Sequence, residues 1–175
     1  MKGGENMSKK IIYIATIACL FGVSFSVSVF AQEMMSRGEQ HRSDVGEVVE
    51  ELMKVAKSDD RIGNEVKTVA QEEQNASTTV KDKMEKIENR SAWKTFLIGS
   101  DYKNLGALRS TLVTTQNHLD RLNKALDKTT STTVKNELEA QIKQLETVKV
   151  KAENFIKDNE SKFSLFGWLV KLFSK

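Results

Sequence analysis

Proline is absent from this chain of 175 residues, and cysteine occurs only once, at Cys19. Without proline, no residue is forced to leave its backbone amide out of a helix, which favours long uninterrupted helices. Cys19 lies in an apolar N-terminal stretch, so residues 32–175 contain neither a disulfide nor a free thiol. Packing alone must therefore stabilise that part of the chain.

Histidine is also scarce, with His41 and His118 far apart in the sequence. A zinc site needs three or four ligands at close spacing, and neither Glu-x-x-His nor His-x-x-x-His occurs. We predict that His118 is a partly exposed surface residue. No Gly-x-Ser-x-Gly motif and no glycine-rich phosphate loop is present, and the many carboxylates lie in charged stretches typical of solvated helix faces. The sequence predicts no enzyme and no catalytic, cofactor or metal site.

The N-terminal region has the features of an export signal. Lys9 and Lys10 precede an uncharged, largely apolar run over residues 11–31. The run ends in Val-Phe-Ala, which has short residues where signal peptidase requires them. We expect cleavage between Ala31 and Gln32, which would remove residues 1–31 as a signal peptide.

Two alternatives for this region stay open. The apolar run is long enough to remain as an uncleaved membrane anchor, and Cys19 could carry a lipid. The basic residues before the run place the rest of the chain outside the cytoplasm, whether the run is cleaved or retained. Met7 offers a more ordinary signal start than Met1, which suggests a bacterial initiator at Met7.

Net charge gives no indication of a nucleic-acid partner. The whole chain has a formal charge of +3, and residues 32–175 have +1 because three lysines and one glutamate lie before them. Aromatic residues are not interleaved with basic ones. We expect neither nucleic acid nor a small-molecule substrate as a partner.

Apolar residues recur every 3.5 residues almost everywhere after residue 44, which predicts helices that pack along a continuous seam. The four predicted seam runs are Val45, Val48, Leu52 and Val55; Ile62, Val66, Val69, Ala76, Val80 and Ile87; Leu105, Leu108, Leu112, Thr115, Leu119, Leu122 and Leu126; and Val134, Leu138, Ile142, Leu145, Val148, Ala152 and Phe155. Three polar residues, Asp59, Glu73 and Lys83, also fall at seam positions of the second run.

Turn-forming residues predict the breaks between helices. Residues 129–133 are polar and β-branched and should connect two antiparallel helices. Residues 99–101 form the second break, with Ser100 or Asp101 as the cap of the next helix. Residues 58–64 suggest a third break, although the apolar phase continues through them, and one helix over residues 41–91 is the alternative.

The last thirteen residues, 163–175, form the most apolar segment outside the N-terminal run. Eight of them are large and apolar, none is acidic, and the polar ones recur as one narrow helical stripe. As a helix this tail spans roughly 20 Å, less than the ~30 Å of a bilayer core. We expect it to lie in a membrane interface or against protein.

The predicted hairpin links the tail to a second aromatic segment. If the chain turns near residue 131, position 100 lies opposite position 161, so residues 92–98 and the tail share one end of the bundle. The expected membrane or partner contacts are Trp93, Phe96, Phe163, Leu165, Phe166, Trp168, Leu169, Lys171, Leu172, Phe173 and Lys175. Tryptophan and phenylalanine beside lysine favour a water–lipid boundary, or equally a small aromatic core under the tail.

Two segments carry a resemblance to known proteins. With T-F-L-I-G-S-D-Y-K-N-L-G-A-L-R-S at 95–110 and F-S-L-F-G-W-L-V-K at 163–171, the chain resembles short exported bacterial helical proteins. No activity is assigned to that group, so the resemblance implies no functional residue.

These observations predict an all-α chain with three parts: a signal peptide or anchor at 1–31, an elongated antiparallel helical bundle or coiled-coil hairpin at 32–160, and an amphipathic helix at 161–175. The favoured function is a non-enzymatic extracytoplasmic structural or interaction protein at a membrane surface. The alternatives are a module whose tail docks on a protein partner or on its own copy as a homo-oligomer, and a holdase-like bundle.

Overall fold

The computed structural model describes residues 35–162 and Phe166. The chain divides into two units, Met1–Met35 and Ser36–Lys175. Five helices make up most of the described part of the second unit: α2 (Arg37–Ser58), α3 (Gly63–Glu88), α4 (Ala92–Ile98), α5 (Tyr102–Lys128) and α6 (Thr132–Glu160). The predicted all-α class and the packing of the helices into a bundle are confirmed, and the described residues contain no strand.

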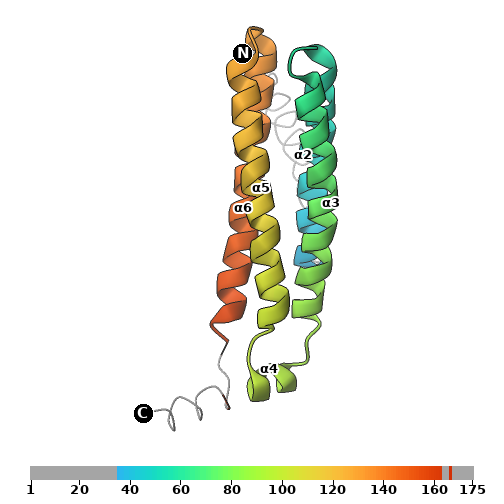
Figure 1. Ribbon diagram of the computed structural model, residues 1–175. Helices are drawn as coiled ribbons and strands as arrows, with labels where there is room; N and C mark the ends of the chain where they lie inside the picture. Colours follow the sequence, from blue (N-terminus) through green and yellow to red (C-terminus); the bar gives the residue numbers. More distant parts are fainter. Residues whose placement is uncertain (1–34, 163–165, 167–175) are drawn as a thin grey trace, which may run out of the picture. The chain divides into compact units, whose positions relative to one another are not determined.

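The four long helices stand side by side, and the short α4 lies across one end of them (Figure 1). Helix α2 packs on α3, α3 on α5, α5 on α6, and α6 on α2. Cross-helix contacts show that neighbours run antiparallel: Asp44 pairs with Lys151 at 2.8 Å, and Arg121 pairs with Glu65 at 2.6 Å. Each long helix therefore buries one face against two neighbours.

Each predicted break is present. Two helices, rather than the alternative single helix, cover residues 41–91. Asp59 ends α2 in an extended conformation, and α3 begins at Gly63. A Cβ atom on Gly63 would lie 2.3 Å from the carbonyl oxygen of Ala56, so only glycine allows this tight return. Asp101 caps α5 and Ser131 caps α6, each by accepting a backbone N–H bond.

The seam predictions hold for three of the four runs. All residues of the first and fourth runs are buried, and in the third run only Leu126 is partly exposed. In the second run Ser77 and Met84 are buried in place of Ala76 and Lys83. The buried positions therefore move by one residue at these two places only, while Val80 and Ile87 keep their predicted positions.

The buried residues form two apolar clusters, one in each half of the bundle. All four long helices contribute to the cluster that includes Leu52, Val66, Leu122 and Leu138. Only α3, α5 and α6 contribute to the cluster that includes Leu105. We call the half with the α2–α3 and α5–α6 loops the loop end, and the half that carries α4 the α4 end.

Candidate functional site

Helix α4 is a short surface element between two long helices, and none of its seven residues is buried. Ser91 begins it by accepting a hydrogen bond from the Lys94 N–H at 3.3 Å. Gly99 ends it with φ 100°, a value that favours glycine, and so turns the chain into α5. The local sequence thus builds a helix of about two turns outside the core.

Four large apolar side chains on and beside α4 are exposed. The exposed fractions are 68% for Trp93, 44% for Phe96, 64% for Ile98 and 63% for Tyr102. We call these four residues the α4 patch. The rings of Trp93 and Phe96 stack on each other with centroids 6.1 Å apart. These four exposed apolar side chains lie within ten residues of the sequence, unlike the scattered single residues that are normal on a protein.

Arg90 fixes the position of α4 relative to the bundle. Its guanidinium donates to the Gly99 carbonyl oxygen at 3.1 Å and lies 3.5 Å from the Asp101 carboxylate. Burial raises the pKa of Asp101, but hydrogen bonds from Asn104 and the nearby positive charges outweigh burial and leave this pKa below its usual range. Both ends of α4 are therefore held by one arginine, and the patch is presented on a fixed support.

The described chain enters and leaves the bundle at the α4 end. Ser36, which caps α2, donates to Glu85 near the end of α3 at 3.2 Å. Ser100 donates to the carbonyl oxygen of Asn159 at 2.6 Å, which confirms that position 100 lies opposite the end of α6. A cleft of about 420 Å³ is lined by both Phe96 and Lys162, so the residue before the tail lies close to α4.

The predicted contact residues are only partly described. Trp93, Phe96 and Phe166 are exposed, with 52% of Phe166 accessible. Phe163, Leu165, Trp168, Leu169, Lys171, Leu172, Phe173 and Lys175, and the cleavage pair Ala31 and Gln32, lie outside the described residues.

Sequence reasoning placed Ile98 and Tyr102 at this end of the bundle but did not include them among the contact residues. Ile98 directly precedes the glycine that ends α4, and Tyr102 directly follows the cap of α5. Both positions are the ends of helices rather than seam positions, and that placement is the signal that could have identified them.

A layer of buried polar side chains separates the two apolar clusters. It consists of His41, Glu73, Ser77, Thr115 and His118, which we call the polar layer. Glu73 accepts hydrogen bonds from the Thr115 hydroxyl at 2.9 Å and from His118 Nδ1. Ser77 donates to the Gln74 carbonyl oxygen at 2.8 Å. Most of the polar layer is thus satisfied inside the bundle, as buried polar groups require.

The prediction that His118 is a partly exposed surface residue is wrong, because only 3% of its surface is accessible. The imidazole can be buried because Glu73 on α3 faces it with a carboxylate. Glu72 also lies 3.3 Å from His118 Nε2. Glu73 was correctly predicted at a seam position, and pairing the two residues from sequence would have required the register between α3 and α5.

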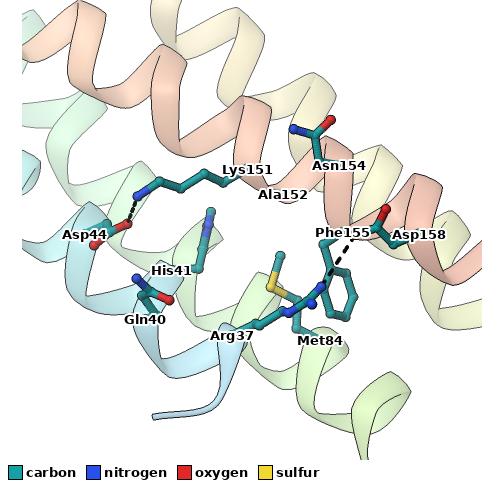
Figure 2. Close-up of a pocket in the computed structure, with 10 residues that line it drawn as sticks. All are labelled: Arg37, Gln40, His41, Asp44, Met84, Lys151, Ala152, Asn154, Phe155 and Asp158. Atoms are coloured by element: carbon teal, nitrogen blue, oxygen red, sulfur yellow. Dashed lines mark hydrogen bonds and ion pairs between the residues drawn. The ribbon is translucent and has the colours of Figure 1, made fainter. Parts of the chain in front are cut away.

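His41 differs from the rest of the polar layer because it faces a cleft between α2 and α6. Figure 2 shows its ring on α2, between Lys151 and Met84. The cleft has a volume of about 380 Å³. Burial lowers the pKa of His41 to about 4, against the opposing effect of Glu73 and Asp44, so the imidazole is neutral at pH 7.

The walls of this cleft already pair most of their charges. Lys151 donates to Asp44 at 2.8 Å, and Arg37 lies 3.6 Å from Asp158. The Arg37 guanidinium also lies 5.8 Å from the centre of the Phe155 ring. The cleft is therefore a charged helix–helix contact with an apolar floor, and it carries no excess charge for an ionic ligand.

Within residues 35–162, no helix combines the length and the apolar character that crossing a membrane requires. In the same described part of the chain, no three His, Cys, Asp or Glu side chains cluster to hold a metal ion. Comparison with known proteins finds no matching family model, no matching curated protein and no matching solved structure.

Proposed function

We propose that this chain is a non-enzymatic, extracytoplasmic structural or interaction protein attached peripherally to a membrane surface through its α4 end. One observation carries the proposal. The α4 patch exposes four large apolar side chains on a fixed support at one end of the bundle. Along the long faces of the bundle, only isolated apolar side chains such as Val113 and Val150 are exposed.

The composition of the patch suits a water–lipid boundary. Tryptophan and tyrosine are enriched at the headgroup level, where an apolar ring and a polar group both find partners. Transferring side chains that are half to two-thirds exposed into an apolar phase contributes about 1–2 kcal/mol each. Lys94, Lys103 and Lys162 are exposed nearby and add up to about 1 kcal/mol each with anionic lipid.

Two attachments at one end would explain stable binding better than one. A single short apolar anchor gives weak and reversible membrane binding, whereas two linked anchors act together. The tail begins directly after Lys162, which lines the same cleft as Phe96. A membrane that contacts the α4 patch is therefore within reach of residues 163–175, and the bundle would project away from that membrane.

Vesicle flotation tests the proposal. The protein should float with vesicles of phosphatidylcholine and phosphatidylglycerol. Removal of residues 163–175 and the double substitution Trp93→Ser, Phe96→Ser should each weaken binding. Val150→Ser removes a half-exposed apolar side chain from α6, outside the α4 patch, and is the matched control. Equal flotation of all four proteins would refute attachment through the α4 end.

A protein partner is the competing occupant of the same patch. The preformed stack of Trp93 on Phe96 resembles the rigid aromatic anchors that dominate protein interfaces. This alternative predicts no binding to vesicles, and a defined oligomer in detergent-free buffer that the same double substitution converts to a monomer. Analytical ultracentrifugation of the two proteins distinguishes the cases.

A further inference from the structure

A second apolar surface lies on the outer side of helices α5 and α6. It is a groove of about 600 Å³, and every residue that lines it belongs to one of these two helices. Leu112 and Ile156 form its floor and are almost fully buried, whereas Val113 on its wall is 62% exposed. We call this surface the outer groove.

The outer groove runs along α6 from Lys149 to Glu160. Eleven residue steps correspond to roughly 16 Å of helix. Ion pairs line its edges, with Arg109 contacting Glu160 and Lys149 contacting Glu153 at 2.6 Å. The groove thus has an apolar floor, charged rims and the length of a short helix, which is the form of a site that receives an amphipathic helix.

The tail of this chain has matching dimensions and begins beside the groove. Glu160 lines the groove, and residues 163–175 start three residues further along. Thirteen residues form a helix of roughly 20 Å. For the tail to fold back along α6, the chain would need a connection of about three residues, which is within the usual range for helical hairpins.

The sequence of the tail also provides the required apolar face. Phe166, Leu169, Val170 and Phe173 follow the spacing i, i+3, i+4, i+7, which is the pattern of a helix that docks in a groove. The polar stripe that includes Gly167, Lys171 and Ser174 lies beside this face, roughly 120° around the helix, and would face water. In the described conformation Phe166 is 52% exposed, so this ring is available to pack elsewhere.

We infer that residues 163–175 dock in the outer groove when no membrane is present, and that docking competes with membrane binding by the tail. The competition with the membrane rests on the proposed function, whereas the docking of the tail in the groove does not. In the closed state the tail hides its apolar face on Leu112, Val113 and Ile156. In the open state the same face enters the lipid surface beside the α4 patch.

The cleft between α2 and α6 is a poorer site for the tail. Both surfaces have two ion pairs at their edges. The apolar residues of this cleft, Met84, Ala152 and Phe155, are all buried, whereas Val113 of the outer groove is 62% exposed. The outer groove instead combines Leu112, Val113 and Ile156 on one surface. The apolar tail therefore matches the outer groove.

Disulfide trapping in the exported protein tests docking directly. Cys19→Ser is included so that only introduced thiols react, whether residues 1–31 are removed or retained. The pair Val113→Cys with Leu169→Cys should form an intramolecular disulfide without vesicles. The pair Val150→Cys with Leu169→Cys is the matched control, because Val150 is exposed on α6 but does not line the groove. Vesicles containing phosphatidylglycerol should suppress the first disulfide.

A second variant measures the competition. Val113→Glu introduces a charge into the groove and should increase vesicle binding about five-fold, the lower end of ordinary coupling between two binding events. Val150→Glu should leave binding unchanged.

The outcomes separate the two proposals. Equal trapping of the Val113 and Val150 pairs, or trapping only between two molecules, would overturn docking in the outer groove while leaving the flotation result intact. Intramolecular trapping of the Val113 pair in a protein that does not float would retain the docking and overturn membrane attachment.

Discussion

The loop end and the α4 end of this bundle differ in the side chains that they expose. At the loop end, Asp59 accepts hydrogen bonds from the Thr129 hydroxyl at 2.7 Å and from the Arg61 N–H at 3.0 Å, and these bonds, the Thr129 bond most of all, lower the pKa of Asp59. Within the described residues, no large apolar side chain is exposed there. At the α4 end, the core lacks a contribution from α2, and four apolar side chains face water.

The buried residues that stabilise the fold are therefore different from the exposed residues that are available for contact. The loop end is closed by polar groups that satisfy one another, so it gains nothing from a further partner. The α4 end keeps apolar surface exposed on an element that contributes no buried residue to the core. A surface on a helix without buried residues, yet held in place by Arg90, is the part of the molecule to which we assign function.

The largest expected effect comes from the core of the loop end. Leu122 is fully buried, so Leu122→Ala should lower the free energy of unfolding by about 2–5 kcal/mol. Trp93→Ala should change it by less than about 0.5 kcal/mol because the side chain is mostly exposed. Urea unfolding followed by circular dichroism measures both. A large loss of stability in Trp93→Ala would mean that α4 is part of the fold rather than a contact surface.

The polar layer between the halves gives the next effect. His118→Leu removes a donor from the buried Glu73 carboxylate and should cost about 3 kcal/mol. Adding Glu73→Leu to His118→Leu should restore most of that loss, because no uncompensated charge then remains in the core. If the double variant is as unstable as the sum of its two single variants, the contact between His118 and Glu73 is not what holds the two halves together.

Acidic pH should lower the free energy of unfolding because of His41. The pKa of His41 is about 4 in the folded protein and 6.5 as its ordinary value, so the unfolded state binds a proton first as the pH falls. Stability is therefore full above pH 6.5, falls between pH 6.5 and 4, and levels off below that. The loss between about pH 7 and pH 5 should be about 2 kcal/mol.

Unfolding at the two pH values measures this loss, and His41→Asn is the control because it removes the titrating group. Asp44 and Glu73, which lie near His41, are present in both proteins. The wild-type protein should lose more stability than the variant. An equal pH dependence in the two would show that His41 is not the cause.

Most of the fold was predictable because it depends on local patterns. The 3.5-residue spacing identified the buried faces of α2, α5 and α6, and the capping residues identified the breaks at Asp101 and Ser131. The second run was placed one residue off at Ser77, because a hydroxyl that bonds its own helix is not visible in an apolar pattern.

The site was predictable only in outline. The turn near residue 131 correctly placed Trp93 and Phe96 at the end of α6. The bonds that Arg90 makes to hold α4 depend on the three-dimensional path of the connection between α3 and α5. The burial of His118 depends on the register between two helices that sequence spacing alone does not fix.

The fluorescence of Trp93 tests the central claim most directly. The chain has two tryptophans, so Trp168→Phe leaves Trp93 as the only indole. With phosphatidylcholine–phosphatidylglycerol vesicles, its emission should shift to the blue and be quenched by brominated lipid, because the α4 patch enters the membrane surface. Unchanged and unquenched emission from protein that floats with the vesicles would contradict the account, since Trp93 would then remain in water while another part of the chain binds the membrane.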